Sequence, residues 1–112
     1  MPPIRPPVLG ELELLVSLAV LKLGGDAYSL AISEEIEATT TRKVSRPAVL
    51  ITLQRLEDKG LLTSWYSDPT PVRGGKAKRI FATKPLGVAA VKLALERINA
   101  MSRGLASILE AK

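Results

Sequence analysis

Apolar residues follow one another at helical intervals through the first part of the chain. From Leu9 to Leu23 they occupy positions 12, 15, 16, 19, 20 and 23, with more at 14, 18 and 21. A helix with this pattern is apolar around almost its whole circumference, so it is expected to be buried on most sides. The adjacent Gly24 and Gly25 favour the left-handed conformation that ends a helix, and they place its end here.

A second helix is expected from about Ser29 to Thr39. Leu30, Ile32 and Ile36 would face inward, while the glutamates between and after them face solvent. A run of three threonines at positions 39–41 closes this helix, because β-branched residues lose side-chain freedom in a helical turn.

The third helix begins at Ser45-Arg46-Pro47. A serine hydroxyl can accept a free backbone N–H of the first turn, and proline is tolerated there because its missing N–H is not needed. The helix should run to Lys59 and stop at Gly60. Its inward stripe is expected to hold Val49, Leu50, Leu53 and Leu56, and its outer face Arg46, Thr52, Arg55 and Lys59.

Two short segments after this helix favour strands. Leu61–Tyr66 and Arg79–Thr83 are rich in β-branched and aromatic residues. The stretch PTPVRGGKAKR, residues 69–79, contains two prolines, two adjacent glycines and four cations without an acid. Two strands joined by such a stretch predict a β-hairpin with a long basic tip.

The last segment, Pro85 to Lys112, predicts one long helix. Apolar or small residues stand at 88, 91, 95, 98, 102, 105 and 109, an alternation of three and four that only Ser102 interrupts. So narrow an apolar seam on a terminal helix is typical of an interface with a partner helix.

Positive charge is concentrated in the middle of the chain. The net charge is +5, but residues 42–84 alone hold ten cations against three acids, whereas residues 1–41 hold two cations against six acids. A basic middle third attracts polyanions, of which nucleic acid is the commonest.

Composition excludes several classes of protein. The chain has no Cys and no His, so it cannot be a disulfide scaffold or a zinc finger, and it cannot use a thiolate nucleophile or an imidazole base. Nothing among the acids marks a pocket, so we expect neither an enzyme nor a metal or cofactor site. The Pro-rich N-terminus lacks the apolar core of a signal peptide, and the longest apolar tract is about half of a membrane span. A soluble, cytoplasmic protein without a membrane segment is therefore expected.

Helix, acidic helix, basic helix, hairpin and long helix is the order of a winged helix-turn-helix domain, a mostly α fold with a small β-hairpin. The third helix of such a domain enters the DNA major groove, about 12 Å wide, and would present Arg46, Thr52 and Arg55 to base edges. The cations of the hairpin tip and the N–H groups freed by Gly74 and Gly75 suit phosphates or a narrow minor groove.

Three stretches carry a resemblance to a known family. They are LGELELLVSLAVLKLGGDAYSLAI, VSRPAVLITLQRLEDKGLL and PTPVRGGKAKRIF, which in this order resemble the PadR family of bacterial transcriptional regulators over about residues 9–91. The resemblance implies a homodimer in which the C-terminal helix packs against the partner, often with the first helix. Two winged domains would then bind a palindromic operator in double-stranded DNA, most often as a repressor.

The resemblance also assigns roles to single residues. By position, Ser45 and Ala48 would lie on the recognition helix with Arg46 and Thr52, and Tyr28 would start the second helix. Leu50 stands where the family usually has a tyrosine, so that hydroxyl is absent, and Thr83-Lys84 replaces the Leu-Thr that caps the last helix. The residues expected at DNA are Tyr28, Lys43, Ser45, Arg46, Ala48, Thr52, Arg55, Arg73, Gly74, Gly75, Lys76, Lys78 and Arg79. Those expected at the dimer interface are Leu15, Leu18, Val88, Val91, Leu95, Ile98, Leu105 and Leu109.

The expected organisation is a Pro-rich arm over residues 1–8, a winged helix-turn-helix domain over 9–83, and a C-terminal dimerisation helix over 84–112. One alternative stays open, a winged-helix module that binds other proteins, although it would not need the basic middle third. Relatives in this branch can bind flat hydrophobic compounds through aromatics on the last helix. This chain has none there, so a small hydrophobic effector stays unidentified.

Overall fold

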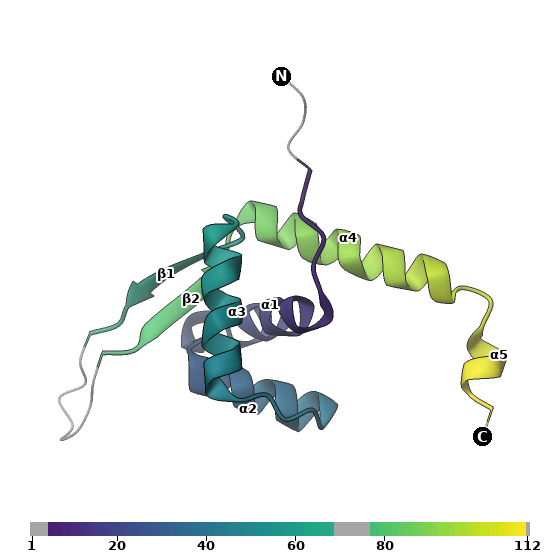
Figure 1. Ribbon diagram of the computed structural model, residues 1–112, viewed down its shortest axis with the longest axis horizontal. Coiled ribbons are helices and arrows are strands. Elements are labelled where there is room, and N and C mark those ends of the chain that lie inside the picture. Colours follow the sequence, from purple (N-terminus) through teal and green to yellow (C-terminus); the bar gives the residue numbers. More distant parts are fainter. Residues whose placement is uncertain (1–4, 69–76, 112) are drawn as a thin grey trace.

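The computed structural model describes residues 5–68 and 77–111. It is mostly helical with one antiparallel hairpin, which confirms the predicted fold class (Figure 1). None of its described helices is long and apolar enough to span a membrane. Its elements are α1 (Glu11–Leu23), the 3₁₀ turn η1 (Gly24–Asp26), α2 (Ser29–Thr40), α3 (Arg46–Asp58), β1 (Leu62–Tyr66), β2 (Arg79–Thr83), α4 (Pro85–Ser102) and α5 (Ala106–Leu109).

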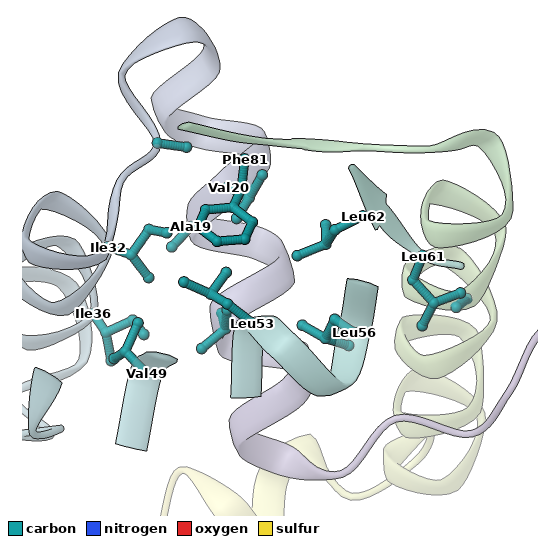
Figure 2. Close-up of a cluster of buried hydrophobic side chains, with 13 residues drawn as sticks. Ala19, Val20, Ile32, Ile36, Val49, Leu53, Leu56, Leu61, Leu62 and Phe81 are labelled. Carbon is teal, nitrogen blue, oxygen red and sulfur yellow. The ribbon is translucent and has the colours of Figure 1, made fainter. Parts of the chain in front are cut away.

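One aliphatic core joins the first three helices to the hairpin (Figure 2). Side chains from α1, α2 and α3 meet there, and Phe81 of β2 covers them as its single large aromatic. The inward prediction for α2 is confirmed for Ile32 and Ile36 but wrong for Leu30, which is exposed. Leu30 lies about 200° from Ile32 around the helix axis, so the two side chains cannot share the inward face.

The helix ends follow the predicted signals. The Ser45 hydroxyl accepts the Ala48 N–H at 3.3 Å, and Pro47 lies in the first turn of α3. Gly24 ends α1 with φ of +57°, and Gly60 follows α3 with φ of +79°. The turn between α2 and α3 is held by the Ser33 hydroxyl, which donates to the Val44 carbonyl at 2.8 Å. These local contacts fix α3 across α1 and α2.

The hairpin is attached to the helical body by backbone hydrogen bonds. Its strands pair from Leu62 with Thr83 to Tyr66 with Arg79. The Phe81 N–H donates to the Ala27 carbonyl at 2.8 Å, and the Leu61 N–H, just before β1, donates to the Leu56 carbonyl of α3 at 2.9 Å. The hairpin is therefore the wing of a winged helix, held beside α3 rather than free of it.

The start of α4 lies against the wing with almost no space. A Cβ on Gly87 would lie 2.2 Å from the Leu61 carbonyl oxygen. The N-cap residue of α4 is Lys84, which makes no side-chain capping hydrogen bond. This agrees with the sequence, where Lys84 replaces the threonine that usually caps this helix. After Ala90 and Val91, which are buried against the three-helix body, α4 runs away from it, and its C-terminal half lies outside with α5 (Figure 1).

The prediction of one unbroken helix from Pro85 to Lys112 is wrong. α4 ends at Ser102, so it is about 27 Å long at 1.5 Å per residue, and a separate turn forms α5. Arg103 is extended, and Gly104 has φ of +84°. Glycine has low helix propensity and adopts this left-handed conformation readily, so it breaks a helix that the apolar spacing alone would continue.

Candidate nucleic-acid interface

α3 presents a solvent-exposed face that is polar at its ends and apolar in the middle. We call this the outer face of α3. It consists of Arg46, Leu50, Ile51, Gln54 and Arg55, all exposed. Ser45, whose hydroxyl is the helix cap, and Ala48 lie in the first turn beside it.

Thr52 is not part of this face, so the prediction that it shares the outer face with Arg46 and Arg55 is wrong. Its side chain is 5% exposed, and its hydroxyl donates to the Ala48 carbonyl at 2.8 Å. Thr52 follows Val49 by three positions and precedes Leu56 by four, which places it in the buried stripe of the helix. A threonine can occupy that stripe because its hydroxyl bonds to the preceding turn.

The prediction for Leu50 is also wrong, in the opposite direction. It was expected in the inward stripe, but its side chain is 46% exposed, and its neighbour Ile51 is 55% exposed. Val49, Leu53 and Leu56 fill the inward stripe, and Leu50 lies about 100° from Val49 around the helix axis. The second turn of the outer face is therefore apolar.

Three cations on or beside the outer face are not held by an ion pair, although the charge of Arg55 acts on Glu13 at longer range. Within residues 5–68 and 77–111, no carboxylate forms an ion pair with Lys43, Arg46 or Arg55. Each of them is exposed. These side chains border the N-terminal half and one flank of α3, where a polyanion would meet them first.

Other nearby cations serve the fold. Arg42 donates to Glu11 at 2.9 Å, and Lys59 donates to Glu13 at 2.7 Å. Burial raises the pKa of Glu13, but hydrogen bonds from Lys59 and from the Gly10 N–H lower it by more, so its pKa lies below the ordinary value. Glu13 is thus an anion that holds the end of α3 on the start of α1.

The tip end of the wing strands meets the start of α2. The Lys78 ammonium lies 4.2 Å from the centroid of the Tyr28 ring, a cation–π contact. The Lys78 N–H donates to the Ser67 hydroxyl at 2.9 Å, and its carbonyl accepts the Ser67 N–H at 2.8 Å. Tyr28 and Lys78, predicted from distant segments, therefore come together. The tip residues Arg73, Gly74, Gly75 and Lys76 lie outside the described residues.

Arg79 points inward from the wing. Its guanidinium donates to the carboxylate of Glu57 on α3 and, at 3.1 Å, to the Ser64 hydroxyl on β1. It also lies 5.0 Å from the Phe81 ring centroid. Arg79 therefore holds the wing on α3, whereas the sequence placed it among the DNA contacts. Sequence reasoning missed the partner groups Glu57, Ser64 and Gln54, because their spacing within α3 and the strands marks no motif.

Replacing Arg79 should loosen the wing. We expect Arg79→Ala to lower the free energy of unfolding by about 1–2 kcal/mol, because it leaves the half-buried Glu57 carboxylate without its donor. Arg79→Lys should recover only part of this, since an ammonium lacks the planar guanidinium fork. Urea denaturation of both variants measures the effect. Combined with Glu57→Gln, the losses should not add, and additive losses would contradict the contact.

The predicted dimer residues divide into three groups. Leu15 and Leu18 of α1 are half-buried and line an apolar hollow beside Ile36 of α2. Val91 is buried within the protomer, so its assignment to a free dimer face is wrong: α4 uses it to pack on the body. The others are exposed on α4 and near α5, namely Val88, Leu95, Ile98, Leu105 and Leu109.

Solved structures share this arrangement. A PadR-family transcription regulator from hypervirulent Clostridium difficile R20291 matches with a TM-score of 0.71 at 19% identity, over 89% of this chain and 99% of its own. A PadR-family transcriptional regulator from Eggerthella lenta DSM 2243 matches with a TM-score of 0.66 at 23% identity, over 91% and 88% of the two chains. A transcriptional regulator from Clostridium thermocellum matches with a TM-score of 0.70 at 19% identity, over 88% and 93%.

No protein-family model matches the chain, and no curated protein sequence does. At identities below one quarter, the solved structures establish the fold. The chain therefore has the winged-helix fold of solved PadR-family transcriptional regulators.

Proposed function

We propose that this protein is a PadR-like transcriptional regulator that binds DNA sequence-specifically, as a dimer, in the cytoplasm, and represses. The observation that carries the proposal is the outer face of α3, where Arg46 and Arg55 form no ion pair with any described residue. A helix of this kind beside a basic wing fits the major groove, with its N-terminal half toward the bases.

The ion pairs that the cations do and do not form support this function. Arg42, Lys59 and Arg79 are held by acids of the same domain. Lys43, Arg46 and Arg55, on or beside α3, have no such partner among the described residues, and neither have Lys92 and Arg97 of α4. A cation that no acid of the domain holds is available to a phosphate, so the three around α3 support DNA binding at that helix.

The C-terminal half of α4 supports dimerisation. The stripe that buries Ala90 and Val91 continues through Ala94, Ile98 and Met101, beyond the helical body. Ile98 is 54% exposed and Met101 82% exposed. A helix end of about ten residues is marginal in water without packing, so a second copy of α4 is the expected cover. Two copies related by a two-fold axis present two recognition helices to a palindrome.

Ile98→Asp should separate the dimer. A carboxylate placed in an apolar interface without a partner weakens association about 100-fold or more. Ala100→Asp is the matched control, because position 100 is exposed on roughly the opposite side of α4. Sedimentation velocity of both variants at micromolar concentration measures the change. If Ile98→Asp stays dimeric, the stripe is not the interface.

Selection from a pool of randomised duplexes tests DNA recognition itself. We expect enrichment of an inverted repeat whose half-sites are centred about one helical turn, or a multiple of it, apart. A module that binds only proteins would enrich no sequence, and its weak association with DNA would be the same for all duplexes. Loss of enrichment in Ile98→Asp, but not in Ala100→Asp, would tie recognition to the dimer.

A further inference from the structure

Two large apolar side chains stand on the outer face of α3. Leu50 and Ile51 are exposed in its second turn, one turn after Arg46 and one turn before Gln54 and Arg55. The remaining apolar side chains of the second and third turns of α3, Leu53 and Leu56, are buried in the core. Two adjacent large aliphatic side chains exposed on one helix indicate a surface that binds a ligand or partner.

Polar groups near them are already engaged. The Thr52 hydroxyl is buried and bonded to Ala48. The Gln54 amide donates to Asp58 at 2.9 Å and accepts from Arg79 at 3.4 Å. The Gln54 amide keeps one N–H and one carbonyl lone pair free, but Gln54 lies one turn beyond Leu50. The second turn of the outer face has no exposed hydrogen-bonding side chain, so its discrimination must come from apolar contact.

The DNA major groove offers one apolar group, the C5 methyl of thymine. Cytosine, adenine and guanine present only donors and acceptors there, which would lose water against Leu50 and Ile51 without gaining a partner. A thymine methyl instead leaves water together with the two side chains. The apolar pair therefore favours thymine over every other base at the positions it covers.

We propose that Leu50 and Ile51 are specificity-determining residues that contact thymine methyl groups in each operator half-site. This inference rests on the proposed function, and it deepens it by naming the base that the middle of α3 selects. Arg46 and Arg55, on either side of the pair, would then bracket an A·T step with contacts to neighbouring bases or phosphates.

Deoxyuridine tests the inference directly, because it differs from thymidine only by that methyl. In the duplex enriched by selection, each thymine is replaced in turn by deoxyuridine. We expect affinity to fall about fourfold at one or two positions per half-site and to stay unchanged elsewhere. The Leu50→Ala/Ile51→Ala protein should bind thymine and deoxyuridine duplexes equally at those positions, since the partner of the methyl is gone. Leu21→Ala, which truncates a leucine of similar exposure on α1, should keep the fourfold difference.

The outcomes separate the inference from the function on which it rests. Sequence-selective binding in which no deoxyuridine replacement matters would overturn the inference and leave the proposed function standing. So would a fourfold loss that persists in the double variant. If no sequence is enriched at all, the proposed function fails and the inference fails with it. Thermal unfolding of the double variant should match that of the unmodified protein, because both side chains are exposed.

Discussion

Gly87→Ala should lower the free energy of unfolding by about 3 kcal/mol, because overpacking against backbone cannot be relieved by a rotamer change. The added Cβ would lie 2.2 Å from the Leu61 carbonyl oxygen and 2.7 Å from the Thr83 side chain. Helix propensity alone predicts the opposite sign, since alanine is favoured over glycine within a helix by about 1 kcal/mol. The direction of the change is therefore informative.

The matched control is Gly25→Ala. Gly25 lies in η1 with nothing within 4 Å of the added Cβ and without a left-handed backbone. We expect Gly87→Ala to melt more than about 10 °C below the unmodified protein, and Gly25→Ala to stay within a few degrees of it. Equal melting of the two variants would mean that α4 does not approach the wing as closely as the structure has it.

The position of Gly87 also bears on the proposed dimer. The close approach sets the angle at which α4 leaves the body, and the exposed stripe through Ile98 follows that angle. Because the Lys84 N–H bonds the carbonyl of the same Leu61, the wing and the start of α4 form one unit. In the proposed dimer, a shift of α4 at Gly87 would therefore change the distance between the two copies of α3 as well as the stability of each domain.

The second large effect is on DNA affinity. Arg46→Ala together with Arg55→Ala should weaken binding to the selected operator about 100-fold at physiological salt, since base and phosphate contacts are each lost. Singly, Arg46→Ala should relax the preference at one base pair. Arg55→Ala should weaken all duplexes alike and reduce the slope of log affinity against log salt by about 1.

Lys92→Ala with Arg97→Ala removes the same charge from α4 and serves as control. Both side chains are exposed and distant in sequence from α3. If this control weakened binding as much as the α3 pair, the overall field and not the outer face would account for the affinity. Fluorescence anisotropy of a labelled duplex measures all four proteins, and circular dichroism confirms that they are folded.

The ends of the first three helices, and the strands, could be predicted from the sequence because local chemistry decides them. Ser45 caps α3 through one hydroxyl, and Gly24 and Gly60 stop helices through a backbone conformation that other residues rarely adopt. The wing strands followed from β-branched and aromatic residues alone. These signals do not depend on how the elements pack.

The phase of α3 could not be predicted with the same precision. Its apolar residues include Leu50, and only the packing against α1 and α2 shows that Thr52 takes the buried place instead. Thr52 can be buried because its hydroxyl bonds to a carbonyl of the same helix, and Leu50 is exposed although it is apolar. Neither follows from a simple division of the helix into an apolar and a polar face. In the same way, the charge of Arg79 gave no sign that Glu57 holds it inside the domain.

The most direct measurement of the central claim is anisotropy of a labelled duplex taken from the DNA just upstream of this protein's own coding sequence. A scrambled duplex is titrated beside it at two salt concentrations. We expect tighter binding to the native duplex, with an affinity that falls by about 0.9 log units per decade of salt for each phosphate neutralised. Weak binding that is equal for both duplexes and indifferent to salt would contradict it.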